Sequence, residues 1–275
     1  MASYLITGAN RGIGLELVTQ LAQAPSSQVS IVFAASRQSE PSDSHASSPL
    51  QNLIDTSSGR VVHVPMVITS RASLDKAAAE IEAHLARIGD GNGDTKGLDV
   101  LINNAGVMPP SFQGIAKMDN LRYALEVNVE AVHETIAAFL PLLQRGTLKK
   151  VVNITTTLGS ITQAPKYTWA PFPAYKISKA AMNMLTVLYA QEYAKEGFTI
   201  FGISPGWLKT EMGSQQADLD VDVGVKAVLD NIFQSTPEKY NGTFQNVRVP
   251  GWENKEGPNQ YDGKVVPWQE TRIDQ

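Results

Sequence analysis

The sequence predicts an α/β fold in which a doubly wound, seven-stranded parallel sheet carries helices on both faces. Short runs rich in β-branched residues alternate along the chain with longer segments whose apolar residues recur at three- and four-residue spacing. This alternation is typical of strands joined by crossover helices, which cover both faces of a parallel sheet. A chain of 275 residues with 43% hydrophobic content can bury such a sheet. We therefore expect a single domain over residues 1–275.

The expected elements follow this pattern in chain order. Strands are predicted at residues 4–7, 29–35, 61–66, 100–103, 150–155, 199–204 and 243–247. Helices are predicted at 12–24, 71–88, 118–144, 174–196 and 221–235. The Ser- and Pro-rich segment 38–59 is placed on the surface, with at most a short helix at 49–56. Residues 248–275 are expected to be irregular, and the stretch 248–260 is either a surface excursion or a cover over the functional site.

Charge and cysteine content argue against several classes of function. The net charge of -4 and the absence of long Lys or Arg runs make nucleic acid an unexpected partner. With no cysteine, the chain has no disulfide, thiolate nucleophile or Cys-ligated metal. The four histidines, His45, His63, His84 and His133, lack the spacing of metal ligands, so we expect no metal site.

Targeting signals are not apparent either. No apolar run approaches the roughly 20 residues that span a bilayer. The first predicted strand begins almost at Met1, which leaves no room for a signal peptide. We expect a cytoplasmic protein with no membrane partner.

A glycine-rich turn follows the first predicted strand. Residues 7–14 read Thr-Gly-Ala-Asn-Arg-Gly-Ile-Gly and lead directly into a predicted helix. Glycines there allow backbone amides to approach a pyrophosphate, which the helix N-terminus also favours electrostatically. The spacing GxxxGxG differs from the usual GxGxxG, so the position of the turn between strand and helix carries the argument.

The residues after the second strand favour NADP(H) over NAD(H). An NAD site would place an acidic residue there to bind the ribose hydroxyls. This chain has Arg37, whose planar fork suits a 2′-phosphate, and Arg11 in the glycine turn adds a second cation. The alternative is that both arginines are solvated surface charges; Glu40 lies nearby in the sequence and could be mistaken for a ribose ligand.

A tyrosine and a lysine four residues apart supply the candidate chemistry. Tyr175 and Lys179 share one face of a predicted helix, and we expect the ammonium to lower the pKa of the phenol from about 10. Tyr175 would then serve as a proton donor. Taken alone, YxxxK is also an ordinary amphipathic helix start; the upstream glycine turn favours the catalytic interpretation.

Five ordered motifs resemble the classical short-chain dehydrogenase/reductase family over residues 3–246. They are TGxxxGxG at 7–14, NNAG at 103–106, Asn128 in Val-Asn-Val, YxxxK at 175–179 and PGxxxT at 205–210. Ser160 and Ile161 and the terminal segment 261–268 are similar to sniffer-type carbonyl reductases and ketoreductases of aromatic polyketide pathways. The resemblance implies a single-domain Rossmann fold and an NADP(H)-dependent oxidoreductase.

The resemblance also implies the site residues. Tyr175 would protonate the carbonyl oxygen, Lys179 would hold the nicotinamide ribose, and Asn128 would tie Lys179 to a water chain. The expected cofactor-binding residues are Gly8, Asn10, Arg11, Gly12, Ile13, Gly14, Arg37, Val67, Asn104, Ala105, Gly106, Tyr175, Lys179, Pro205, Gly206 and Thr210.

Two departures from the family pattern affect these assignments. The family serine after the fifth strand aligns with Thr156, whose hydroxyl can donate the same hydrogen bond. Thr155 or Thr157 is the donor if the register differs by one residue, and all three are ordinary strand formers. The Asp that usually binds the adenine amine is Val67, so we expect adenine to be held by apolar contact and main-chain hydrogen bonds.

The loops 156–174 and 207–220 are expected to line a substrate pocket at the carboxyl ends of the strands. The first loop carries Tyr167, Trp169, Pro165, Pro171 and Phe172. Met108, Pro109 and Pro110 after the fourth strand, and Trp207 and Met212 after the sixth, would approach from the other side. A bulky, partly aromatic ketone or aldehyde suits such a lining. These aromatic residues alternatively only pack the loops onto the body.

Two helices carry more apolar residues than one sheet face would cover. In the helix at 174–196 these include Ile177, Met184, Leu185 and Leu188. We expect a homodimer through this helix and the one carrying Asn128, with a monomer as the alternative.

The leading hypothesis is an NADPH-dependent carbonyl reductase that transfers hydride to a small-molecule ketone or aldehyde. The alternatives are an NAD(P)-dependent secondary-alcohol dehydrogenase that works oxidatively and a non-catalytic NADP-binding sensor. Tyr175, Lys179 and Asn128 argue against the sensor, because a sensor needs no proton relay.

Overall fold

The computed structural model describes residues 1–37, 48–88 and 97–268. Seven parallel strands form one sheet in the order β3-β2-β1-β4-β5-β6-β7. The strands are β1 (Ala2–Thr7), β2 (Val29–Ser36), β3 (Val61–Pro65), β4 (Val100–Asn103), β5 (Lys150–Ile154), β6 (Thr199–Ser204) and β7 (Phe244–Asn246). The order reverses between β1 and β4, where ligands bind beyond the carboxyl ends of the strands in folds of this kind.

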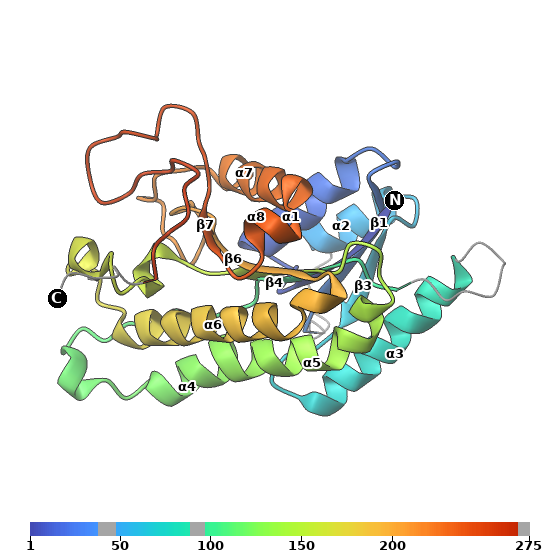
Figure 1. The fold of residues 1–275 in the computed structure, drawn as a ribbon, viewed down its shortest axis with the longest axis horizontal. Helices are drawn as coiled ribbons and strands as arrows, with labels where there is room; N and C mark the ends of the chain where they lie inside the picture. The colour runs from blue at the N-terminus through green and yellow to red at the C-terminus, as the bar shows by residue number, and fades with distance from the viewer. Residues whose placement is uncertain (38–47, 89–96, 269–275) are drawn as a thin grey trace.

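Helices cover both faces of the sheet (Figure 1). They are α1 (Gly12–Gln23), α2 (Pro49–Thr56), α3 (Arg71–Arg87), α4 (Leu121–Leu125), α5 (Ala131–Gln144), α6 (Pro173–Glu192), α7 (Val221–Gln234) and α8 (Pro237–Tyr240). Residues of α1, α2 and α7 pack on one face, and residues of α3, α5 and α6 pack on the other. No helix within the described ranges is long and apolar enough to cross a membrane.

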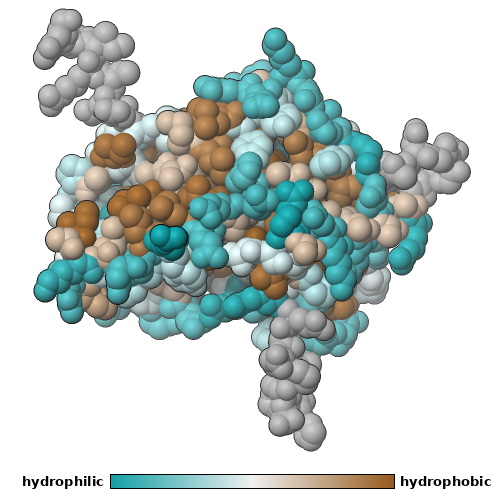
Figure 2. Space-filling view, turned by 90° about the horizontal axis from the view of Figure 1, so that it is seen from below, coloured by the Kyte–Doolittle hydropathy of each residue, from teal (hydrophilic) through white to brown (hydrophobic). Residues whose placement is uncertain are grey.

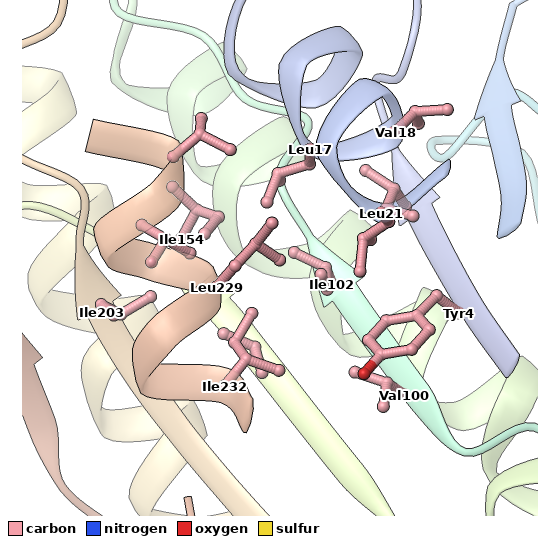
Figure 3. Packing of buried hydrophobic residues seen from close by; sticks show 14 of the residues in the cluster. Tyr4, Leu17, Val18, Leu21, Val100, Ile102, Ile154, Ile203, Leu229 and Ile232 are labelled. Atoms are coloured by element: carbon pink, nitrogen blue, oxygen red, sulfur yellow. The ribbon is translucent and has the colours of Figure 1, made fainter. Parts of the chain in front are cut away.

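Alternate residues of each strand serve the two halves of the core. In β1, Tyr4 and Ile6 face α1 and α7, whereas Leu5 faces α3 and α5. Figure 3 shows the first half, where side chains of α1 and α7 meet those of the central strands. Because both faces are buried, the strands are apolar throughout rather than alternating.

The predicted strands are all present, with ends that differ from the predictions by no more than two residues. The predicted helix at 118–144 is divided, because a π-helical turn (Glu126–Glu130) separates α4 from α5. The predicted helix at 174–196 gives way after Glu192 to a 3₁₀ turn (Ala194–Glu196), which ends at Gly197 in a left-handed conformation. The short helix α2 lies where it was expected, and the start of the surrounding Ser-rich segment lies outside the described residues.

Candidate active site

The glycines of the turn between β1 and α1 have no side chains, so the backbone of this turn is open to close approach. A Cβ on Gly14 would lie 2.1 Å from the carbonyl oxygen of Gly8, so no other residue fits there. Gly8 and Gly12 have φ of +68° and +54°, which glycine adopts without strain. No side chain caps the N-terminus of α1, whose backbone amides are therefore available to an anion. This cradle fits the pyrophosphate of a dinucleotide.

The segment after β4 is fixed against this turn by Thr7. The Thr7 hydroxyl accepts hydrogen bonds from the amides of Asn104 and Ala105, both at 3.0 Å. The Asn104 side chain donates back to the carbonyl of Thr7 at 2.9 Å. These bonds bring the two predicted cofactor segments together at the point where the strand order reverses.

Arg37 and Arg11 both border the cavity above the glycine turn. Arg37 directly follows Ser36, whose hydroxyl is 2.9 Å from Nε2 of His63 on β3. Arg11 forms an exposed ion pair with Glu211, which belongs to the loop 207–220. The structure thus keeps both cations at the site but gives one of them a carboxylate partner. Glu40 lies outside the described residues.

The main-chain amide of Val67 has a partner that was not expected. Its amide, which was expected to remain available to adenine, donates instead to the hydroxyl of Ser73 in the first turn of α3 at 2.9 Å. Its carbonyl accepts from Ser70 at 3.0 Å. The apolar contribution remains, because Val67 lines the cavity beside Met66 and Ile68.

Tyr175 and Lys179 lie in the first turns of α6 and border the same cavity. The Lys179 ammonium is 5.8 Å from the centre of the Tyr175 ring and donates to the carbonyl of Ile154 at 2.7 Å. The lysine side chain is therefore anchored to the end of β5, which fixes its position relative to the phenol.

The expected lowering of the tyrosine pKa is wrong for this structure. Burial raises the pKa of the Tyr175 phenol, and burial lowers the pKa of Lys179 to about 7. Both shifts have one cause, since a site removed from water disfavours phenolate and ammonium alike. The phenol consequently keeps its proton at neutral pH.

Asn128 occupies the π-helical turn and is fully buried. Its Oδ1 accepts from the amide of Val107 at 2.9 Å, and its Nδ2 donates to the carbonyl of Val107 and to the hydroxyl of Ser178 at 2.8 and 2.9 Å. A Cβ on Gly106 would lie 3.0 Å from Asn128 Oδ1 and 3.8 Å from Lys179 Nζ. The glycine therefore keeps the space between these two polar groups open.

Ser178 was not identified from the sequence. Its hydroxyl donates to the carbonyl of Tyr175 at 2.9 Å and accepts from Asn128. It thereby joins α6 to the π-helical turn directly behind the phenol. Its position inside the YxxxK motif was the available signal, but serine is also common on helix surfaces.

The hydroxyls of the three threonines after β5 have different partners. Thr155 donates to Oδ1 of Asn183 at 2.7 Å, and Thr157 donates to the hydroxyl of Tyr167 at 2.9 Å. Thr156 accepts from the amide of Leu158 at 3.3 Å and has no acceptor for its proton among the described residues. Thr156 also borders the cavity, so it is the threonine best able to donate to a bound carbonyl.

The turn after β6 faces the glycine turn across the cavity. Gly206 has φ of +88°. A Cβ on Gly12 would lie 3.6 Å from Cγ2 of Thr210, so these two segments approach closely. The hydroxyl of Thr210 accepts from the amide of Gly213 at 3.0 Å, which fixes the turn. Pro205, Gly206 and Thr210 thus border the cavity as predicted.

All these segments enclose one cavity of about 1370 Å³. Its aromatic wall includes Trp169 and Trp207, whose ring centres are 5.9 Å apart. The predicted lining residues that border it are Met108, Pro109, Tyr167, Trp169, Pro171, Phe172, Trp207 and Met212, whereas Pro110 and Pro165 do not. Residues 258–262 and 264–267 border it too, whereas residues 248–257 do not, so only the end of the stretch 248–260 contributes to the lining. Residues 269–275 lie outside the described part of the chain.

Nothing in the described part of the chain groups three His, Asp or Glu side chains closely enough to hold a metal ion. The polar groups that border the cavity include the hydroxyl of Thr156, the phenol of Tyr175 and the ammonium of Lys179. These groups suit proton transfer and polarisation of a carbonyl oxygen.

Comparisons with known proteins match this arrangement. The family model of the short chain dehydrogenases matches residues 3–220. Short-chain dehydrogenase/reductase atnB of Arthrinium sp. is 35% identical over 223 residues, which cover 77% of this chain and 76% of the relative. Short-chain dehydrogenase RED3 of Pyricularia oryzae is 27% identical over 276 residues, which cover 97% and 98%.

Two solved structures are similar along nearly the whole chain. The NADPH bound carbonyl reductase from chicken fatty liver has 29% sequence identity and a TM-score of 0.77, and the match covers 98% of this chain and 94% of that chain. The carbonyl reductase Sniffer of D. melanogaster has 28% identity and a TM-score of 0.77, with coverage of 98% and 100%.

Proposed function

The chain belongs to the short-chain dehydrogenase family, and on that premise we propose that it is an NADPH-dependent carbonyl reductase acting on bulky, apolar or aromatic ketones and aldehydes. One observation carries the proposal. A half-buried, protonated phenol, Tyr175, and a threonine hydroxyl whose proton has no acceptor among the described residues, Thr156, border the same cavity as the glycine turn. A carbonyl oxygen placed between two such donors is activated toward hydride.

The glycine turn and the arginines support NADP(H) as the cofactor. The cradle at Gly8, Gly12 and Gly14 would hold the pyrophosphate, and Arg37 with Arg11 would hold a 2′-phosphate. The similar carbonyl reductase from chicken fatty liver was solved with NADPH bound. The cofactor, when bound, supplies the hydride that reduces the carbonyl carbon.

The side chains supply the proton. As the carbonyl carbon gains hydride, its oxygen becomes an alkoxide, and Tyr175 donates its phenolic proton to that oxygen. An alkoxide is a much stronger base than a phenolate, so the transfer is favourable even though burial raises the pKa of Tyr175. Thr156 donates a hydrogen bond to the same oxygen and stabilises its developing charge.

Lys179 and Asn128 restore the proton after turnover. With its pKa lowered to about 7, Lys179 can both release and accept a proton near neutral pH. The space left open at Gly106 joins Lys179 to the amide of Asn128, and a chain of water molecules through it would lead protons to the phenol. These two residues are therefore assigned to proton supply rather than to the reacting carbonyl.

The raised pKa of Tyr175 supports the reductive direction. Oxidation of an alcohol requires Tyr175 to act as a base, in its phenolate form, which burial disfavours. Reduction requires the protonated form, which burial favours. The site is thus better suited to reduction than to the oxidative alternative.

A titration followed by turnover assays tests the function. NADPH and NADH are titrated separately by nicotinamide fluorescence, and loss of reduced-nicotinamide absorbance is then measured with aromatic ketones, quinones and aldehydes. We expect tighter binding of NADPH and turnover of at least one bulky carbonyl compound. Tight binding without any turnover would favour the sensor, and equal preference for NADH would remove the role given to Arg11 and Arg37.

The variant Tyr175→Phe provides the matched control for these assays. It removes the proton donor and retains the ring, so turnover should fall by at least about a hundredfold while NADPH binding changes little. Undiminished turnover in this variant would contradict the assignment of Tyr175.

We also propose a homodimer formed through α6. Ile177, Met184 and Leu188 are 39%, 60% and 54% exposed and lie along one side of this helix. Figure 2 looks onto the face carried by α4, α5 and α6 and shows apolar residues gathered over part of it. A second copy of the chain would bury this stripe.

A further inference from the structure

The C-terminal segment 248–268 is bound to the end of β6 and β7 rather than extending into solvent. Val249 and Tyr261 pair through a main-chain hydrogen bond of 3.0 Å, and Val266 donates to the carbonyl of Phe244 in β7 at 2.7 Å. The ring of Trp252 packs on that of Tyr261 with centres 5.3 Å apart. Figure 1 shows this segment, in red, at the same end of the sheet as the start of α6.

Tyr261 lies directly against the turn that follows β6. It is only 4% exposed, and a Cβ on Gly206 would lie 3.1 Å from Cε1 of its ring. The Tyr261 hydroxyl accepts a hydrogen bond of 3.1 Å from the amide of Trp207. The ring thus packs beside Gly206, and the hydroxyl binds the backbone of the turn at residues 205–207.

Asp218 fixes the orientation of this tyrosine. The Tyr261 hydroxyl donates to Oδ2 of Asp218 at 2.5 Å, and Nδ2 of Asn259 donates to the same oxygen at 2.7 Å. Charge-assisted hydrogen bonds of this kind are short and strong. Asp218 does not itself border the cavity, so any effect it has on the site passes through Tyr261 or Asn259.

A second set of hydrogen bonds holds the segment to the loop after β5. Thr157 donates to the hydroxyl of Tyr167, which in turn donates to the carbonyl of Pro258 at 3.2 Å. The hydroxyl of Ser160 donates to the carbonyl of Pro267 at 2.7 Å. The segment is therefore attached on two sides of the cavity, and Tyr261 is at the attachment nearest to the cofactor turn.

We propose that Tyr261, oriented by Asp218, is a positioning residue that sets the turn at residues 205–207 where this turn borders the cavity. The inference rests on the proposed function, which assigns Pro205 and Gly206 to the cofactor. Tyr261 donates no proton to the substrate in this assignment. Its hydroxyl holds the Trp207 amide, and its ring occupies the space beside Gly206.

The variant Tyr261→Phe tests this role, because it keeps the ring and removes both hydrogen bonds. We expect kcat to fall roughly tenfold or more, since small displacements of reacting groups slow catalysis strongly. The dissociation constant of NADPH should change by less than about threefold, because the cradle for the pyrophosphate lies elsewhere. The emission spectrum of bound NADPH, which reports the surroundings of the nicotinamide without turnover, should also change.

Two variants of Asp218 separate positioning from general loss of structure. Asp218→Asn keeps an acceptor for the Tyr261 hydroxyl and should retain most of the wild-type kcat and emission. Asp218→Ala removes the acceptor and should resemble Tyr261→Phe. Tyr240→Phe is the matched control, because the Tyr240 hydroxyl bonds Asn231 at 3.3 Å and is not at the cavity; it should leave kcat and emission unchanged.

The outcomes distinguish this inference from the proposed function. Wild-type kcat and unchanged NADPH emission in Tyr261→Phe would overturn the positioning role while leaving the reductase intact. Changed emission in Tyr261→Phe, together with a wild type that reduces no carbonyl compound, would support the positioning role and overturn the reductase. A wild type that binds no NADPH would overturn both.

Discussion

The hydroxyl groups at this site differ in whether they already donate a hydrogen bond to another residue. Thr155 and Thr157 donate to Asn183 and Tyr167, whereas Thr156 has its proton free within the described structure. In the proposed reaction, Thr156 is assigned to polarise the substrate because of its hydrogen-bond partners, since all three threonines follow the same strand. Register alone could not separate them in the sequence.

Substitutions of Thr156 test this selection. Thr156→Ser keeps the hydroxyl and should retain activity, whereas Thr156→Val keeps the shape and should lower kcat by about a hundredfold, the effect of losing one such donor. Steady-state reduction of a bulky ketone measures both. Thr155→Val is the matched control, and a larger loss of kcat in that variant than in Thr156→Val would move the donor by one residue.

The buried ammonium of Lys179 makes stability depend on pH. Burial lowers its pKa from 10.5 to about 7, so between these values the unfolded chain holds a proton that the native chain has released. The free energy of unfolding contributed by this group therefore rises as pH increases through that window, and it is constant below pH 7. The pKa of Tyr175 is raised, so its phenol adds nothing within most of the window.

We expect Lys179→Met to lose this dependence. Relative to the variant, the wild type should gain at most about 1.4 kcal/mol per pH unit as the pH rises from neutrality toward 10. Urea denaturation of both proteins at a series of pH values measures the difference. A difference that stays constant with pH would show that the native lysine keeps its ordinary pKa.

At the scale of the elements, the glycine turn places a strict requirement on the residue type at position 14. Gly14→Ala would place a Cβ 2.1 Å from the carbonyl of Gly8, in the middle of the cradle. We expect this variant to lose NADPH affinity by at least about a hundredfold, because the amides of the turn must move away from the pyrophosphate. Fluorescence titration measures the loss.

Gly146→Ala is the control for this experiment. Its Cβ would lie 2.1 Å from the carbonyl of Leu98, an equal clash with backbone in the loop before β5 and away from the cavity. It should lower the melting temperature but leave NADPH affinity unchanged once the protein is folded. Equal loss of affinity in both variants would mean that the effect of Gly14→Ala is general destabilisation.

Elements that have a periodic pattern of apolar residues in their own sequence were predictable. Features that depend on contacts with distant residues were not. The strands and α1, α3 and α7 follow from apolar periodicity, because each buries a face against the sheet. The π-helical turn at Asn128 leaves no periodic signal, since it arises from hydrogen bonds to Val107 and Ser178. The commitment of the Val67 amide to Ser73 likewise depends on how α3 begins.

At the site, ordered motifs identified the residues but not their electrostatics. The segments carrying Tyr175, Asn128 and the glycine turn come together as predicted. The pKa of Tyr175 was misjudged because sequence spacing reveals the neighbouring ammonium but not the burial that outweighs it. The role of the C-terminal extension could not be inferred, because its anchors at Asp218 and Tyr167 are distant in sequence.

On the scale of the whole molecule, the two layers of helices that cover the sheet differ in the apolar side chains that they expose to solvent. The face carrying α6 has the exposed apolar residues Ile177, Met184 and Leu188, whereas α7 on the other face has Val223 at 40% exposure. A stable pair of chains needs roughly 1,200 Å² or more of buried surface, so the proposed interface has to extend beyond these three side chains.

The double variant Met184→Asp with Leu188→Asp tests the dimer. Two carboxylates in the centre of the interface would be buried without partners, so association should weaken by several kcal/mol and the variant should be monomeric at micromolar concentration. Light scattering coupled to size exclusion measures the mass.

Val223→Asp is the control, because it places the same charge on the opposite layer of helices and should leave the dimer intact. A wild type that is monomeric at every concentration would refute the interface. Because Tyr175 and Lys179 border the cavity and are not among the exposed apolar residues of the same helix, the monomeric variant should also bind NADPH like the wild type. This result would separate the assembly of the protein from the function of its site.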